Sequence, residues 1–129
     1  MTDPIGSMIT MIKNASLAEK ETVLLPYSKL KVAVAECLIK EGYLKSYSKK
    51  TKKNHPFLEL NILINENGGK VKEVDRISKP SRRVYMGMKE IRPIKNGHGL
   101  AVYSTPKGIM SGKEARKEMV GGELLFTMW

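Results

Sequence analysis

The sequence predicts an α+β protein, with an N-terminal α-β-α-β-β module packed against a C-terminal, mostly β module that has one short helix. In the first half, apolar residues repeat at helical spacing in two segments. The remaining regular segments are mainly strand-like, and turn residues rich in Asn and Gly fill positions 65–69. We therefore expect two modules, residues 1–66 and 67–129. Each is small for an independent core, so we expect them to share an interface.

The first module should begin with a helix and a strand. Asp3 and Pro4 suit the N-cap and the first helical position. The apolar residues that follow predict a buried helix face that fades near Ala18: Ile5, Met8, Ile9 and Ile12. Thr22–Pro26 should form a short strand that ends at the proline.

A second helix should start after Ser28, which can cap it, and stop at Gly42. Cys37 lies in its apolar stripe, which predicts a buried core thiol. A single cysteine cannot form an internal disulfide and fits a reduced, cytosolic compartment.

Two strands should complete this module. The first is expected at 43–48 and the second, with alternating apolar residues, at 58–64. Four lysines between them, at positions 49, 50, 52 and 53, predict a mobile polar hairpin tip with an electrostatic role at most.

The second module should contain strands at 71–77, 100–103 and 123–129. Ser111 and Glu114 match a capping box and should open the short helix. We expect Gly121-Gly122 to close it.

Charge points to a polyanionic partner. The chain carries 23 Lys and Arg against 13 Asp and Glu, a net charge of +10 with a pI near 9.7. Residues 1–66 contribute +3 and residues 67–129 contribute +7. Such an excess, concentrated in one half, is typical of nucleic-acid binding. No apolar stretch approaches the ~20 residues of a membrane span, and the N-terminus does not resemble a signal peptide.

No catalytic or cofactor pattern accompanies this charge. His55, His98 and Cys37 match no metal-ligand spacing. Gly97-His98-Gly99 lacks the third glycine and the following helix of a dinucleotide fingerprint. We predict that the chain is not an enzyme and uses no cofactor, metal or small-molecule substrate.

Three C-terminal stretches combine groups that suit structured RNA. Arg82, Arg83 and Tyr85 offer guanidinium forks and an aromatic face for stacking. The segment 104–108 places two hydroxyls, a lysine and a glycine in one turn, which suits 2′-OH groups and phosphates. Gly121-Gly122 can bring bare backbone near RNA, with Glu123 accepting from a base amino group. Each stretch alone has an ordinary structural explanation.

Taken together, the chain resembles the bacterial ribosomal protein S8 family from end to end. The matching blocks are Asp3-Pro4-Ile5, Ile12-Lys13-Asn14-Ala15, Pro26-Tyr27-Ser28-Lys29-Leu30-Lys31, Glu41-Gly42-Tyr43, Arg76-Ile77-Ser78-Lys79-Pro80, Arg83-Val84-Tyr85, Ser104-Thr105-Pro106-Lys107-Gly108-Ile109-Met110, Lys113-Glu114-Ala115-Arg116 and Val120-Gly121-Gly122-Glu123. The most specific part runs from 104 to 123.

The resemblance implies a structural role in the small ribosomal subunit. Such a protein binds an irregular helix in the central domain of small-subunit (16S) rRNA and assists its assembly. Ser104, Thr105 and Lys107 would then make the specific contacts, supported by Tyr85, Gly122 and Glu123. Phosphate contacts would come from Lys29 and Lys31, more weakly from Asn14, with Arg82 and Arg83 as further cations.

The expected partners are this rRNA and neighbouring small-subunit proteins, with no membrane, and the free protein should be a monomer. It should work in cytoplasmic ribosomes, with an organellar ribosome also open. An alternative function is repression of an mRNA that carries a look-alike hairpin. Two departures from the family pattern stand out: Pro106 replaces a usual serine, and Ser81-Arg82 replaces a usual Gly-Leu.

Overall fold

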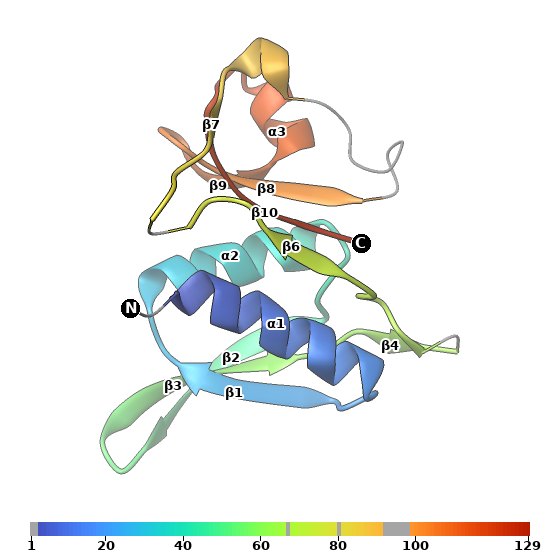
Figure 1. Cartoon of the computed structure of the whole chain (residues 1–129). Coiled ribbons are helices and arrows are strands. Elements are labelled where there is room, and N and C mark those ends of the chain that lie inside the picture. Colours follow the sequence, from blue (N-terminus) through green and yellow to red (C-terminus); the bar gives the residue numbers. More distant parts are fainter. Residues whose placement is uncertain (1–2, 67, 80, 92–98) are drawn as a thin grey trace. The chain divides into compact units, whose positions relative to one another are not determined.

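The computed structural model describes residues 3–66, 68–79, 81–91 and 99–129, and it confirms the predicted α+β fold (Figure 1). Its elements are α1 (Pro4–Leu17), β1 (Thr22–Pro26), α2 (Lys29–Lys40), β2 (Ser46–Lys52), β3 (His55–Asn61), β4 (Ile64–Asn65), β5 (Gly68–Gly69), β6 (Val74–Arg76), β7 (Tyr85–Met86), the 3-10 turn η1 (Met88–Glu90), β8 (Leu100–Thr105), β9 (Gly108–Ser111), α3 (Gly112–Lys117) and β10 (Gly122–Met128). None of the helices in these described ranges is long and apolar enough to cross a membrane.

The chain divides into two compact units, which we call the N-terminal unit (Pro4–Lys72) and the C-terminal unit (Asp3 with Glu73–Trp129). The division into modules at 1–66 and 67–129 stays a prediction.

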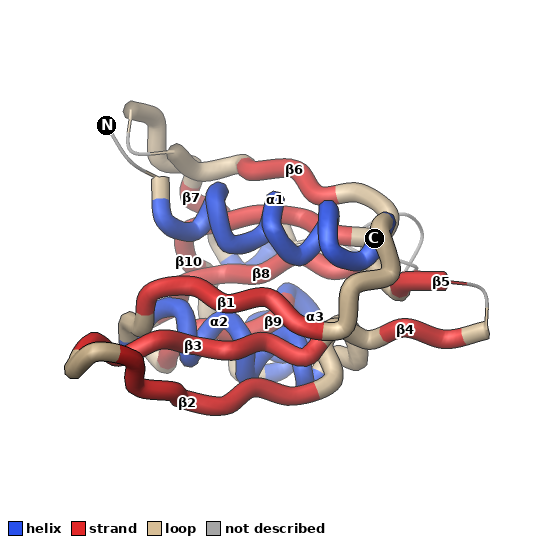
Figure 2. The backbone as a smooth tube through the Cα atoms, turned by 90° about the horizontal axis from the view of Figure 1, so that it is seen from below, coloured by secondary structure: helices blue, strands red, loops and turns tan. Residues whose placement is uncertain are grey.

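In the N-terminal unit, an antiparallel sheet of order β1-β3-β2 carries α1 and α2 on one face (Figures 1 and 2). Alternate residues of β1 and β3 point to the helices and are buried: Val23, Leu25, Leu58 and Leu60. Cys37 lies in the same core, as predicted. The Val71 N–H donates to the buried Ser16 hydroxyl at 2.9 Å, which ties the segment after β5 to α1.

All three α-helices end in a Schellman motif, in which a residue just past the helix takes a left-handed conformation. This residue is Glu19 after α1 (φ 55°), Gly42 after α2 (φ 81°) and Met119 after α3 (φ 61°). In α3, the N–H groups of Met119 and Val120 donate to Arg116 O and Ala115 O.

The predicted starts of α2 and α3 are confirmed by hydrogen bonds to their capping serines. The Ser28 hydroxyl accepts from Lys31 N, and the Ser111 hydroxyl accepts from Glu114 N. Gly42 ends α2 as expected, but the prediction that Gly121-Gly122 closes α3 is wrong. Met119 takes that position, two residues earlier, and Gly122 already belongs to β10.

Strand boundaries differ most in the lysine-rich segment. We expected a strand at 43–48 followed by a polar tip, yet β2 begins at Ser46 and continues to Lys52. Pairing with β3 holds these polar residues in the sheet, from Ser46↔Asn61 to Lys52↔His55. Only Lys53 and Asn54 form the turn, so most of the lysine run is strand.

The C-terminal unit is built around β10. The sheet has the order β6-β10-β8-β9. On the side of β10 opposite β8, β7 pairs with the start of β10 and β6 pairs with its end. α3 packs on this sheet, and the core between them is a cluster of buried apolar residues from α3, the sheet and the end of η1: Ile91, Ala101, Tyr103, Met110, Ala115 and Leu124. The predicted strand at 71–77 is reduced to β6, while β7 and β9 were not predicted at all.

Candidate nucleic-acid interface

Three side chains from strands distant in sequence form a row across the C-terminal sheet. Glu123 of β10 pairs with Tyr85 of β7 on one side and with Ser104 of β8 on the other. Residues directly opposite each other in antiparallel strands share a face, with Cβ atoms about 5 Å apart. The sheet register therefore assembles an aromatic ring, a carboxylate and a hydroxyl.

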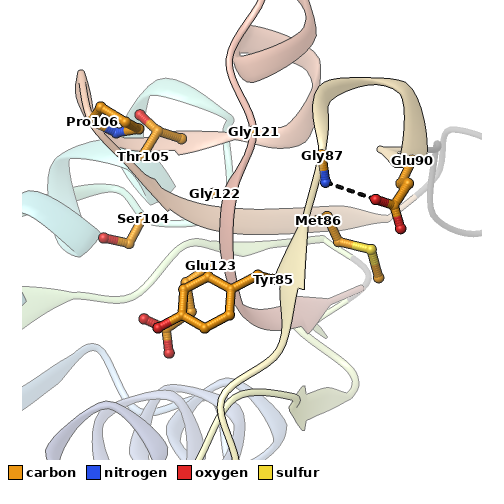
Figure 3. A pocket seen from close by; sticks show the side chains of 10 residues that line it. All are labelled: Tyr85, Met86, Gly87, Glu90, Ser104, Thr105, Pro106, Gly121, Gly122 and Glu123. Atoms are coloured by element: carbon orange, nitrogen blue, oxygen red, sulfur yellow. Dashed lines mark hydrogen bonds between the residues drawn. The ribbon is translucent and has the colours of Figure 1, made fainter.

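This row lies in an open hollow of about 610 Å³ (Figure 3). The hollow is lined by Tyr85, Met86, Gly87, Glu90, Ser104, Thr105, Pro106, Gly121, Gly122 and Glu123. Tyr85 is 69% exposed, which is unusual for an aromatic residue on a sheet and leaves its ring available for stacking.

The turn between β8 and β9 is held by one hydroxyl. Thr105 Oγ1 donates to Gly108 O at 2.8 Å and accepts from Lys107 N at 3.1 Å. Gly108 has φ 120°, a conformation that favours glycine. The Lys107 ammonium reaches Glu118 at 3.4 Å, a surface ion pair of small net energy. Thr105 therefore shapes the turn that presents Lys107.

Ser104 differs from its neighbour, because its hydroxyl makes no hydrogen bond with any residue that the structure describes. Both its donor and its acceptor capacity remain open for a ligand. The preceding residue, Tyr103, is buried in the core, and this burial raises the pKa of its phenol.

The two glycines before Glu123 allow close backbone packing. A Cβ on Gly122 would overlap with the carbonyl of Ser104, and a Cβ on Gly121 would lie 2.9 Å from Gly87 Cα and 3.0 Å from Met88 N. We had predicted a close approach to RNA for this pair. The structure shows a further reason for these glycines within the fold. The backbone at the end of β7 and the backbone of β8 could not approach Gly121 and Gly122 this closely if either glycine carried a side chain.

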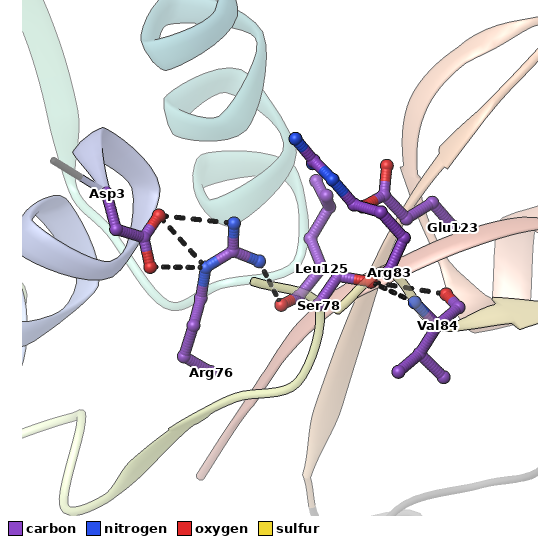
Figure 4. Close-up of polar contacts among 7 residues, drawn as sticks. All are labelled: Asp3, Arg76, Ser78, Arg83, Val84, Glu123 and Leu125. Atoms are coloured by element: carbon purple, nitrogen blue, oxygen red, sulfur yellow. Dashed lines mark hydrogen bonds and ion pairs between the residues drawn. The ribbon is translucent and has the colours of Figure 1, made fainter. Parts of the chain in front are cut away.

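Glu123 is paired with a cation. Its Oε2 accepts from Arg83 Nη1 at 3.1 Å, with the carboxylate side chain 15% exposed and the guanidinium side chain 49% exposed (Figure 4). Arg82, the neighbouring cation in the chain, is exposed, and its side chain makes no hydrogen bond or ion pair with another described residue.

A buried serine closes the loop that carries both arginines. Ser78 Oγ accepts from Val84 N at 2.8 Å and donates to Val84 O at 3.2 Å (Figure 4). Val84 O in turn accepts from Leu124 N in β10. Arg83 therefore directly precedes a residue that is anchored to the strand that holds Glu123.

A second anchor lies at β6. The Arg76 guanidinium forms a forked ion pair with Asp3 at 3.0 Å and also donates to Leu125 O (Figure 4). This pair is largely buried, so it fixes geometry more than a surface pair would.

In the N-terminal unit, the predicted phosphate contacts do not form one cluster. Lys29 is the first residue of α2, and Lys31 Nζ donates to Pro26 O at 3.1 Å. Asn14 is exposed in the last turns of α1, a different helix.

Comparison with known proteins identifies the family of the chain. The family model described as Ribosomal protein S8 matches residues 3–129. The chain is 47% identical to the small ribosomal subunit protein uS8 of Ruegeria pomeroyi over the whole of both chains. It is 48% identical to the uS8 of Novosphingobium aromaticivorans over 97% of this chain and 95% of the relative.

The chain belongs to the ribosomal protein S8 family.

For this S8-family chain, the structure brings most of the predicted C-terminal residues together. Tyr85, Ser104, Thr105, Gly122 and Glu123 line one hollow, with Arg83 bound to Glu123. Lys107 projects from the adjoining turn. Arg82 is on the same loop as Arg83, and Lys29, Lys31 and Asn14 belong to the other unit.

Sequence reasoning missed Met86, Glu90 and Ser78. The first two line the hollow, where Glu90 Oε1 accepts from Gly87 N at 3.1 Å. Met86 and Glu90 lie in the two-residue strand β7 and just after it, where the sequence shows no periodic pattern. Ser78 had one signal in the sequence, because Ser78-Lys79 belongs to a block that matches the family. His98, which fits no metal-ligand spacing in the sequence, lies outside the described residues. Among those described, no group of three His, Cys, Asp or Glu side chains could hold a metal ion.

Proposed function

We propose that this S8-family ribosomal protein is a structural constituent of the small subunit. It binds an irregular helix in the central domain of small-subunit (16S) rRNA and helps this domain assemble, working in cytoplasmic ribosomes beside other small-subunit proteins. The observation that carries the proposal is the row Tyr85–Glu123–Ser104, which three strands fix in one register.

The row combines the contacts that recognise unpaired nucleotides. The exposed Tyr85 ring offers a stacking surface for a base that has left its helix. Glu123 can accept from a base amino group, and Ser104 can both donate and accept. An irregular helix presents such base edges, whereas a regular RNA duplex hides them in its narrow major groove.

Charge compensation makes a carboxylate acceptable in this interface. An unpaired Glu123 would repel the phosphates of the RNA that its neighbours bind. Arg83, at 3.1 Å, offsets that charge while half of its side chain stays exposed for a phosphate of its own. Arg82 and Lys107 add cations on the adjoining loops, where they can bind backbone phosphates.

The N-terminal unit contributes phosphate contacts through Lys29 and Lys31 at the start of α2, with Asn14 as a weaker contact. The bond between Lys31 and Pro26 O holds the ammonium close to the protein surface. An mRNA hairpin that copies the rRNA would fit the same residues, so repression remains a prediction.

The decisive experiment removes the one open hydroxyl. Ser104→Ala should leave the melting temperature unchanged, because no described residue loses a hydrogen bond. It should weaken binding to the central-domain rRNA hairpin roughly threefold to tenfold, as expected for one net hydrogen bond. Titrations against this hairpin, and against a version whose internal loop is fully paired, measure the preference.

Ser48→Ala is the matched control, since Ser48 is also a half-buried strand serine without a described hydrogen-bond partner. It should bind both RNAs as the wild type does. Equal affinity of the wild type for the two RNAs would contradict the proposed recognition of an irregular helix.

A further inference from the structure

The β2–β3 hairpin extends past the rest of its sheet. β1 pairs with β3 only as far as Pro26↔Phe57. Beyond that point β2 and β3 continue alone through Thr51↔Pro56 and Lys52↔His55. Every residue from 49 to 56 is exposed, and we call this segment the basic finger.

The finger has a defined backbone. Its turn residues Lys53 and Asn54 have φ values of 50° and 65°. Two successive left-handed residues characterise the two-residue turn that best matches the twist of paired strands. Asparagine adopts this conformation readily, whereas lysine does so at a cost in free energy. The four lysines thus project from a paired ribbon and its tight turn.

The finger accounts for most of the net positive charge of its unit. Pro4–Lys72 holds twelve lysines and six glutamates, a net charge of +6. Four of those lysines and no acidic residue lie in the finger, so the remainder of the unit carries only +2. The lysines occupy both faces of the ribbon, because Lys50 and Lys52 alternate with Lys49 along β2.

The base of the finger continues into the predicted phosphate contacts at the start of α2. The Lys49 ammonium lies 4.6 Å from the centre of the Tyr27 ring. Tyr27 N donates to Pro56 O at 3.3 Å, and Tyr27 precedes the helix cap Ser28 by one residue. Tyr27 therefore joins the base of the finger to the segment that leads into α2, where Lys29 and Lys31 lie.

Protection of an edge strand accounts for only part of this pattern. β2 is an edge strand, and a charged residue on such an edge discourages pairing with another chain. One lysine on the pairing edge is sufficient for that purpose. It does not account for a fourth lysine in the turn, held there in a conformation that lysine disfavours.

We propose that the basic finger binds the phosphodiester backbone of an RNA helix and gives the protein a second, sequence-independent RNA contact. This rests on the proposed function, which it extends to a surface outside the C-terminal hollow. Lysine ammonium groups bind phosphates as point charges without reading bases. RNA is favoured over an anionic membrane because Pro56 is the one apolar residue in the finger, and membrane-surface segments pair their cations with large apolar side chains.

The test uses the full chain and the central-domain rRNA. Lys50→Gln/Lys52→Gln removes two charges from one face of the finger. The control, Lys20→Gln/Lys45→Gln, removes two exposed charges elsewhere in the same unit. A plot of log affinity against log salt has a negative slope. Compared with the wild type, the magnitude of this slope should decrease by about 1.4 to 1.8 in the finger variant and stay unchanged in the control. The ratio of wild-type affinity to finger-variant affinity should then be roughly tenfold larger at 50 mM salt than at 200 mM.

A tethered cleavage reagent gives an independent readout. Iron-EDTA attached at Thr51→Cys should cut the rRNA backbone locally. The same reagent at Thr22→Cys, at the opposite end of the sheet, should not produce those cuts. Cys37 is buried and should stay unlabelled in the folded protein.

The outcomes separate the finger from the proposed function. If the two double variants have equal salt-dependence slopes and still prefer the irregular helix, the proposal for the basic finger is overturned. The proposed function is then unaffected. A finger variant that loses binding to phosphatidylglycerol vesicles while its rRNA slope is unchanged also overturns the proposal. If the wild type shows no preference for the irregular helix over the fully paired RNA, the proposed function is contradicted. The salt-dependence slopes still test the proposal for the basic finger in that case.

Discussion

The two units present their candidate RNA-binding groups in different ways. In the C-terminal hollow, Glu123 is bound to Arg83 and the Thr105 hydroxyl holds its own turn, so most polar groups have fixed partners. In the basic finger, Lys50 and Lys52 have no side-chain partner among the described residues. Reading bases requires groups fixed within a fraction of an ångström, whereas binding phosphates requires mainly a high density of positive charge.

The largest effect should come from breaking the backbone packing of the C-terminal hollow. Gly121→Ala places a Cβ against the backbone of Met86, Gly87 and Met88, none of which can rotate away. We expect a loss of about 3 kcal/mol in the free energy of unfolding, as for an overpacked core, together with loss of the preference for the irregular helix. Urea denaturation measures the first and titration the second.

Gly87→Ala is the matched control. Its φ of −73° suits any residue, and an added Cβ would meet only the flexible Glu90 carboxylate at 3.2 Å. If both variants were equally stable, the close approach of β7 to Gly121 would not matter for folding.

A double-mutant cycle tests whether Arg83 protects Glu123 from the RNA phosphates. Arg83→Gln should weaken rRNA binding roughly threefold to tenfold when Glu123 is present, because it exposes an uncompensated carboxylate. In a Glu123→Gln background the same change should cost less, since only a direct phosphate contact is lost. Additive effects on the measured affinities would mean that the two residues act separately.

The smallest effects concern two helix ends, one in each unit. Gly42 and Met119 occupy equivalent left-handed positions, and Met119 is 73% exposed. Met119→Gly should stabilise the protein by roughly 0.5–1 kcal/mol. Gly42→Ala should destabilise it by about 1 kcal/mol through backbone strain alone, because nothing lies within 4 Å of the added Cβ. Thermal unfolding of the two variants should shift in opposite directions.

Sequence patterns predicted the fold where local rules operate. The first strand, the Ser28 and Ser111 caps and the buried Cys37 follow from periodicity and capping chemistry. β7 was missed because its pairing partner β10 lies far along the chain, and β9 was missed because it is a short strand that pairs with β8 across a tight turn. The end of α3 was placed wrongly because glycine is the usual left-handed residue, and here methionine adopts that conformation.

The candidate site shows the same limit. Composition and motif resemblance identified Tyr85, Ser104 and Glu123, but only the sheet register shows that they are neighbours. The Arg83–Glu123 pair and the Ser78 anchor were not predictable, because both depend on how an irregular loop folds back on β10.

The central place of β10 has a consequence for the nascent chain. β6, β7 and β8 all pair with this strand, which is the last one in the sequence. While the protein is being synthesised, β8 can pair with β9, but β6 and β7 have no described pairing strand until residues 122–128 leave the exit tunnel. All three strands of the N-terminal sheet lie within residues 22–61. The basic finger can therefore pair before residues 122–128 are synthesised, whereas the C-terminal hollow can form only after them.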